Sequence, residues 1–130
     1  MKEITRLMIN EYRLKDIDFM GYYFTKKTAS YHHLIIPKRL NGPETIENGA
    51  VLNKITSHPY LHIIEHTEYD MFIAITQEII DEKNLGRLNK ANLRRIRDIL
   101  RCFEEEHKDD VTSRRRHLIR PVFVRGRIDI

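Results

Sequence analysis

The most informative part of the chain runs from Tyr31 to Glu65 and reads YHHLIIPKRLNGPETIENGAVLNKITSHPYLHIIE. Two extended apolar runs joined by a turn come first, and a segment with two histidines four residues apart follows. Residues four apart lie on one face of a helix, so the imidazoles of His58 and His62 can approach the same metal ion. A third ligand must then come from another segment.

The first apolar run, residues 31–37, carries the neighbouring histidines His32 and His33, and we expect it to be a strand. Successive side chains of a strand point to opposite faces, so these two imidazoles cannot approach one ion in the same way. They should therefore have different roles. The turn that follows contains Asn41-Gly42, which supplies a residue tolerant of positive φ.

Asn48 begins the second run, which we also expect to be a strand and whose apolar part is residues 50–52. A side-chain amide can bond both an N–H and a C=O of a facing loop, so Asn48 can hold the histidine strand in one conformation. Asn53 is a second candidate for this role and ranks below Asn48.

The expected helix starts near Ser57, a good N-cap, with Pro59 in its first turn. His66 continues the series of histidines and could replace His58 as a ligand, although we expect it to be exposed. Glu65 lies about one turn beyond His62, where a carboxylate either orients an imidazole or is simply solvated.

In their order and spacing, these residues resemble the HNH motif of endonucleases, also called the ββα-metal or His-Me finger. The matching residues are His32, His33, Pro37, Gly42, Glu47, Asn48, His58 and His62. The resemblance implies a metal site made of His32, His58 and His62. It also implies that His33 is the general base that activates water, with Asn48 as the middle residue of the motif. One departure is Gly49, where family members commonly have leucine.

The function that the resemblance implies is metal-dependent hydrolysis of phosphodiester bonds in nucleic acid, with DNA favoured over RNA. Three imidazole ligands favour Zn²⁺ or Ni²⁺, and looser binding of Mg²⁺ or Mn²⁺ stays open. Lys38 and Arg39 directly follow the histidine strand and could bind substrate phosphates, although a solvated role is equally open. Paired cuts by single sites would require a homodimer.

Two alternatives belong to other classes of protein. One is a catalytically inactive, zinc-stabilised domain that binds nucleic acid or protein. The other is a helical interaction module with incidental histidines. Retained metal and a need for His33 would separate the nuclease from both.

We expect an α+β fold in a single domain that spans residues 1–130. Within it, residues 1–30 would cover one side of the finger, residues 31–66 would form the ββα-metal finger, and residues 67–107 a helical hairpin. Residues 108–130 form a basic tail: they carry seven lysines and arginines against three aspartates, which accounts for the whole formal net charge of +4. Such a tail can neutralise phosphates without reading sequence, or remain solvated without a partner.

The hairpin is expected from two apolar faces at helical spacing. Thr67 and Asp70 resemble a capping box before the first helix, Gly86 interrupts the pattern, and Asn89 can cap the second helix. Cys102 lies near the border of the second apolar face, where we expect a buried or half-buried thiol. In the tail, Val122-Phe123-Val124 could add an edge strand or stay disordered until a partner binds.

The composition, with 41% hydrophobic and 32% charged residues, is typical of a soluble globular protein. No apolar run approaches the roughly 18 residues of a membrane span, so we expect no membrane partner. Cys102 is the only cysteine, which excludes an internal disulfide and a cysteine-built zinc ribbon and favours the cytoplasm.

Overall fold

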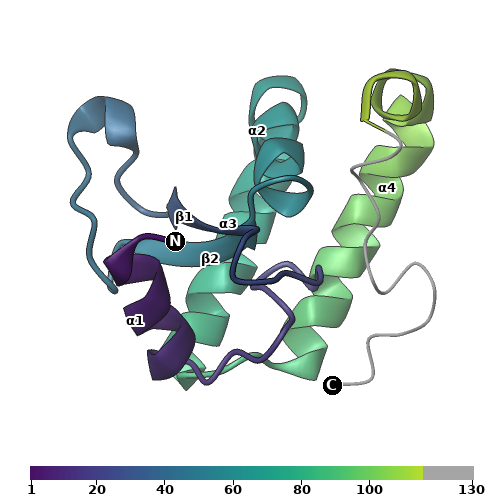
Figure 1. Ribbon diagram of the computed structural model, residues 1–130. Helices are drawn as coiled ribbons and strands as arrows, with labels where there is room; N and C mark the ends of the chain where they lie inside the picture. Colours follow the sequence, from purple (N-terminus) through teal and green to yellow (C-terminus); the bar gives the residue numbers. More distant parts are fainter. Residues whose placement is uncertain (116–130) are drawn as a thin grey trace.

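The computed structural model describes the backbone of residues 1–115 and the side chains as far as Phe103. Over these residues the chain has an α+β fold of four α-helices, one short 3-10 helix and a two-stranded antiparallel sheet (Figure 1). The elements are, in order, α1 (Glu3–Glu11), β1 (Ala29–His33), η1 (Lys38–Leu40), β2 (Gly49–Asn53), α2 (Ser57–Thr67), α3 (Tyr69–Leu85) and α4 (Lys90–Arg115). The expected strand at residues 122–124 lies outside the described residues.

The two expected strands and the helix after them are present as β1, β2 and α2, but the first strand differs from its prediction. It spans Ala29–His33 rather than residues 31–37. The reason is that the N–H and C=O of Ile36 bond to the side chain of Asn48 instead of to a strand. Asn48 itself lies just before β2, which begins at Gly49.

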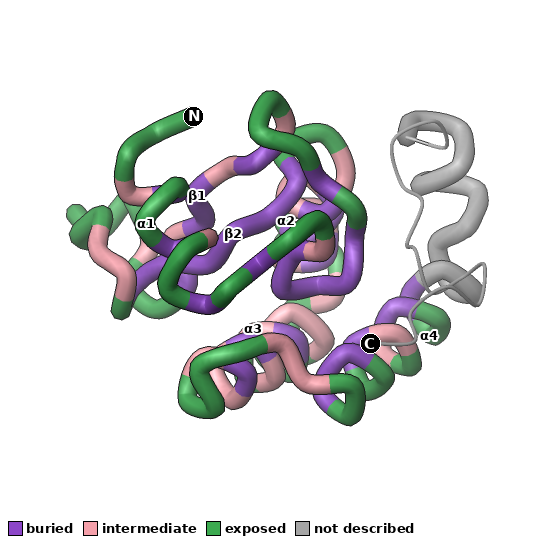
Figure 2. The backbone as a smooth tube through the Cα atoms, turned by 60° about the horizontal axis from the view of Figure 1, so that its bottom comes forward, coloured by how far each residue is buried: buried purple, intermediate pink, exposed green. Residues whose placement is uncertain are grey.

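The helices α3 and α4 lie side by side, next to the sheet and α2 (Figure 2). α1 packs against both strands and α2 against β2, while α3 packs on α2 and α4 on α3. The predicted apolar faces of the last two helices are buried; their fully buried members are Ile75, Ile79, Leu93, Ile96, Leu100 and Phe103. Among the described helices, none combines the length and apolar character needed to cross a bilayer.

Asp18 joins the N-terminal loop to the end of β2 and the start of α2. Its buried carboxylate accepts hydrogen bonds from the backbone N–H groups of Met20, Tyr22 and Asn53, at 2.8, 3.0 and 2.9 Å, and from the hydroxyl of Ser57. Burial raises the pKa of Asp18 to about 6, although these hydrogen bonds oppose the shift. The first residue of α2 is therefore fixed by an acid 39 positions earlier.

Both predicted N-caps in the middle of the chain are wrong. Ser57 is the first residue of α2 rather than its cap, because its hydroxyl bonds to Asp18. Thr67 belongs to α2, where its hydroxyl donates to the carbonyl oxygen of Ile63, so it forms no capping box with Asp70. A tertiary or intrahelical acceptor replaces the cap in each case.

In the helical hairpin, the end of α3 and the start of α4 agree with the prediction, whereas the end of α4 and the exposure of Cys102 do not. Gly86 ends α3 with φ of 75°, and the side chain of Asn89 accepts hydrogen bonds from the first turn of α4, as expected. α4 continues to Arg115 instead of ending near residue 107, so the first part of the predicted tail is helical. Cys102 is exposed, not buried, because the apolar face of α4 is confined to one stripe.

Candidate metal centre

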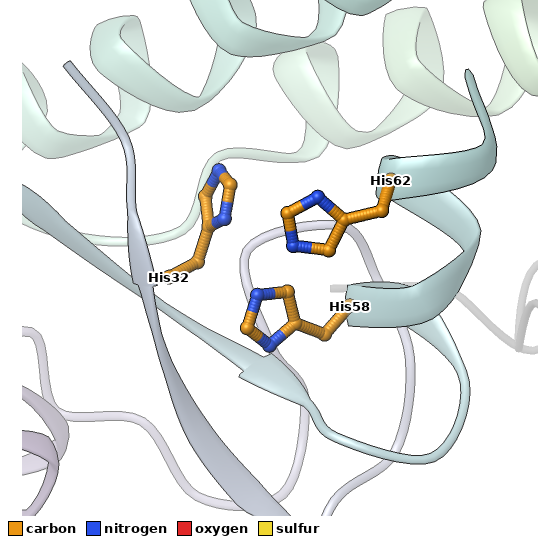
Figure 3. A group of neighbouring side chains, drawn as sticks. All are labelled: His32, His58 and His62. Atoms are coloured by element: carbon orange, nitrogen blue, oxygen red, sulfur yellow. The ribbon is translucent and has the colours of Figure 1, made fainter. Parts of the chain in front are cut away.

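Three histidines from two elements converge beside the sheet (Figure 3). His32 extends from β1, and His58 and His62 extend from consecutive turns of α2. Each offers a ring nitrogen, and these nitrogens all lie within 4.8 Å of one another. The three side chains are therefore close enough to hold one metal ion. His66, the fourth histidine of the series, is exposed as expected and lies outside this cluster.

The strand register explains how His32 reaches α2. His32 pairs with Ala50 of β2, and directly opposed residues of an antiparallel pair present their side chains on the same face. The methyl group of Ala50 leaves space on that face, so the ring of His32 can lie between the strand and α2. Its centroid is 5.2 Å from that of His58 and 5.8 Å from that of His62.

His32 is the most buried of the three histidines. It is only 4% exposed, and its Nε2 atom is buried without a hydrogen-bond partner among the described residues. Burial first, and then the neighbouring His58 and His62, lower its pKa to about 3. A metal-binding imidazole must be neutral before the ion binds, and the lowered pKa of His32 meets this requirement.

The orientation of His58 is set by Ser30, two positions before His32 on the same strand. Ser30 Oγ donates its proton to the carbonyl oxygen of Leu52 and lies 2.9 Å from Nδ1 of His58. A hydroxyl donates only one hydrogen bond, so Nδ1 of His58 must carry the proton of this pair. Its Nε2 is then left as the acceptor. Burial lowers the pKa of His58 to about 4, which keeps this ring neutral.

His62 is oriented by Glu65, which lies 3.2 Å from Nδ1 of His62. Of the two roles considered for Glu65, the structure therefore favours the orienting one, because an ionised carboxylate only accepts hydrogen bonds. Nε2 of His62 is again left available. Contacts of this kind fix the tautomer of metal-binding histidines in proteins.

Three imidazoles whose ring nitrogens lie within 4.8 Å of one another fit a borderline divalent ion such as Zn²⁺ or Ni²⁺. The fit rests on this proximity and on the tautomers that Ser30 and Glu65 favour in His58 and His62. Protein ligands for a fourth position are absent from the cluster among the described residues.

The fourth histidine, His33, lies apart from this cluster but opens into the same space. A hollow of about 790 Å³, which we call the histidine hollow, is lined by His32, His33, His58 and His62 together with Lys38, Arg39, Glu44, Glu65, Tyr69 and Phe72, among others. Nε2 of His33 is 3.9 Å from a carboxylate oxygen of Glu44, and Tyr31 packs edge-on against the ring, 4.9 Å away. Burial lowers the pKa of His33, although Glu44 opposes this shift.

Asn48 holds the loop after β1, which is the role expected of it. Its Oδ1 accepts from the N–H of Ile36 at 2.7 Å, and its Nδ2 donates to the carbonyl oxygens of Ile36 and Pro43, both at 3.0 Å. Asn53 has a different role: it bonds to Tyr23 and to backbone N–H groups that precede α2. Of these two asparagines, only Asn48 thus bonds to the loop beside the histidine strand.

Two glycines allow close approaches around this loop. At Gly42, a Cβ would lie 1.9 Å from the carbonyl oxygen of Ile36, so the turn can close only with glycine there. The positive φ of the turn belongs to the preceding Asn41, at 59°. At Gly49, a Cβ would lie 2.2 Å from the ring of Tyr31. The departure from the family's leucine at residue 49 therefore has a local cause.

Lys38 and Arg39 are exposed on η1, and both line the histidine hollow. Arg39 lies 3.8 Å from Glu65, the same acid that orients His62. The two cations are positioned where a phosphate near the cluster would meet them, and neither is drawn into the core.

Three residues around the site, Ser30, Glu44 and Lys83, were not identified from the sequence. Ser30 could have been, because it precedes His32 by two and residues two apart on a strand share a face. No sequence pattern indicates Glu44 or Lys83. Lys83 extends from α3 and donates to the carbonyl oxygens of Ile46, Glu47 and Gly49, which flank Asn48.

No family model, curated protein or solved structure matches this chain. The resemblance to the HNH motif thus rests on the residues quoted above. The geometry adds the proximity of His32, His58 and His62 in space.

Proposed function

We propose that this chain is an HNH-type, metal-dependent endonuclease that hydrolyses phosphodiester bonds in nucleic acid, with DNA favoured over RNA. The observation that carries the proposal is the convergence of His32, His58 and His62 within 4.8 Å, beside a separate histidine, His33, in the same hollow. A binding cluster next to an unligated imidazole supplies both parts that such hydrolysis needs.

One divalent ion would be held by His32, His58 and His62, with Zn²⁺ or Ni²⁺ favoured by the nitrogen ligands. When bound, such an ion supplies charge neutralisation for a phosphate and its leaving oxygen. Ser30 and Glu65 keep two of the ligand rings in the tautomer that leaves Nε2 unprotonated.

His33 would act as the general base. Because burial lowers its pKa, the ring is neutral at about pH 7 and can accept a proton from water. Glu44, 3.9 Å from Nε2, would then stabilise the imidazolium that forms. Tyr31, packed edge-on against the ring, restricts its rotation.

Asn48 would position the loop between β1 and β2 through its bonds to Ile36 and Pro43. This loop carries Lys38 and Arg39 on η1, so its conformation sets where the two cations meet substrate phosphates. The basic segment beyond residue 108 would add affinity for nucleic acid without sequence preference.

The decisive experiment compares His33→Ala with His66→Ala, a matched variant at an exposed histidine that lines the same hollow but lies outside the cluster. Cleavage of plasmid DNA, single-stranded DNA and RNA is followed with Mg²⁺, Mn²⁺, Ni²⁺ or Zn²⁺, and bound metal is measured in parallel. We expect His33→Ala to lose roughly 100- to 10,000-fold in rate while it keeps its metal. His66→Ala should keep both metal and cleavage, and the double variant His58→Ala/His62→Ala should lose both.

Each other outcome contradicts a defined part of the proposal. If the wild-type chain retains an ion but cleaves none of these substrates, the chain is a zinc-stabilised binding domain rather than an enzyme. If His33→Ala cleaves as fast as His66→Ala, the base is another group. If no ion is retained at all, the histidines are incidental.

A further inference from the structure

The lining of the histidine hollow includes four apolar side chains that are exposed, which we call its apolar lining. Ile35 and Leu40 come from the loop after β1, and Tyr69 and Ile73 come from the start of α3. These four side chains are between 47% and 64% exposed and are not part of the apolar core. Apolar residues gathered in one hollow, unlike scattered ones, indicate a binding surface.

Tyr69 is the aromatic member of this apolar lining. It is 61% exposed, and its ring stacks on that of Phe72, with centroids 5.9 Å apart and an interplanar angle of 26°. Phe72 is itself half-buried, so it supports one face of Tyr69 while the rest of the ring faces the hollow. The first turn of α3 thus presents a rigid aromatic platform.

The platform lies in the same hollow as two cations and the metal cluster. Lys38 and Arg39 offer charge-assisted donors to phosphate, while Tyr69 and Ile73 offer an apolar flat surface. A ligand that satisfies both has anionic groups along a backbone and flat apolar faces beside it. Nucleic acid has both, but its base faces are accessible only where the bases are unpaired.

From this arrangement we infer that the hollow binds an unpaired nucleotide, whose base stacks on Tyr69 while its phosphates face Lys38, Arg39 and the metal cluster. The inference rests on the proposed endonuclease function and narrows its substrate to single-stranded or locally unpaired nucleic acid. A fully paired duplex would leave Tyr69 without a stacking partner.

The test measures equilibrium binding of the full chain in EDTA, so that no cleavage occurs, to three probes compared at equal phosphate concentration. These are a short oligothymidylate, the same backbone with abasic sites, and the duplex of oligothymidylate with its complement. The basic tail contributes similarly to the first two probes, so their ratio isolates base stacking. We expect the thymine-bearing strand to bind roughly 5- to 150-fold more tightly than the abasic strand.

Variants at Tyr69 locate the effect. Tyr69→Ala should reduce the ratio between thymine-bearing and abasic strands to near one, and Tyr69→Phe should preserve it because the ring is retained. Tyr23→Ala, at another exposed tyrosine that does not line the hollow, should leave the ratio unchanged. If Tyr69→Ala does not fold, the comparison of probes with wild type and Tyr69→Phe still decides the matter.

Equal binding of the thymine-bearing and abasic strands by wild type would overturn the inference, as would a preference for duplex. The inference would also be overturned if the wild-type chain formed a concentration-dependent dimer that Tyr69→Ala converts to a monomer. The apolar lining would then be a contact between copies of this chain. Cleavage of paired DNA together with a ratio near one between thymine-bearing and abasic strands would overturn this inference and leave the endonuclease proposal intact. A high ratio without cleavage in the presence of any of the metals would overturn the endonuclease proposal and leave the binding of unpaired nucleotides intact.

Discussion

The ring of Tyr31 lies so close to Gly49 that a Cβ at residue 49 would be 2.2 Å from Cε2 of the tyrosine. The ring cannot move aside easily. Its hydroxyl lies 2.7 Å from the carbonyl oxygen of Thr45 and accepts from the N–H of Thr45 at 3.0 Å. The same tyrosine packs against His33. A single aromatic ring therefore links the glycine of β2, the turn and the proposed general base.

Gly49→Ala should destabilise the chain by about 1–3 kcal/mol, because the added methyl group overpacks against a fixed ring. The same substitution in a Tyr31→Leu background should cost much less, since the ring that it meets is gone. Urea unfolding of the two single variants and the double variant gives the coupling free energy. Equal costs of Gly49→Ala in both backgrounds would show that the contact does not set the choice of glycine.

Ser30→Ala should weaken the binding of Zn²⁺ by roughly 10- to 100-fold, because the residue that fixes the tautomer of His58 is removed. Ser30→Thr keeps the hydroxyl and should keep most of the affinity. Competition with a chromophoric chelator measures both, and Thr67→Ala, which removes an exposed hydroxyl at the far end of α2, is the control. An affinity for Ser30→Ala equal to that of Thr67→Ala would mean that the 2.9 Å contact with His58 does not orient a ligand.

The parts of the site that follow from local spacing could be predicted from the sequence. The distance of one helical turn between His58 and His62 brings them to one face, whereas His32 was expected as the third member only from the resemblance to the HNH motif. The end of β1 could not be predicted in this way, because the backbone N–H and C=O of Ile36 bond to the side chain of Asn48 rather than to a strand.

What the sequence could not predict are contacts between distant residues. Ser57 has the chemistry of an N-cap, but Asp18 binds its hydroxyl from 39 positions away, and no local pattern indicates that competition. Lys83 likewise reaches the carbonyl oxygen of Ile46 across 37 positions. Such pairs arise only once the helices are packed, so propensity at either residue alone does not indicate them.

Glu82 should make the stability of the chain depend on pH in the neutral range. Its carboxyl group is fully buried, and burial raises its pKa from 4.5 to about 9, with Asp18 and Glu78 adding to the shift. The folded state then holds a proton that the unfolded state has lost, so stability falls as pH rises through this window. Asp18, whose pKa is raised to about 6, titrates mostly below it.

Glu82→Gln should abolish this dependence, because the neutral amide has no proton to lose. Between roughly pH 6.5 and pH 8, the stability of the variant relative to wild type should rise by up to about 2 kcal/mol. Urea unfolding at several values of pH measures the difference, with the exposed Asp98→Asn as the control. A difference that stays constant over this range would show that Glu82 is ionised in the folded chain.

Lys83 should stabilise the turn that carries Asn48 without contributing to metal binding. Its ammonium donates to the carbonyl oxygens of Ile46, Glu47 and Gly49 and lies 5.6 Å from the ring centroid of Tyr12. Lys83→Met keeps the length of the side chain but removes every donor, so we expect a loss of about 1–3 kcal/mol in unfolding free energy. The affinity for Zn²⁺ should not change, because the three histidines are held by β1 and α2. Lys90→Met, at an exposed lysine of α4, is the matched control. If Lys83→Met were as stable as Lys90→Met, the carbonyl groups around Asn48 would be satisfied without the lysine.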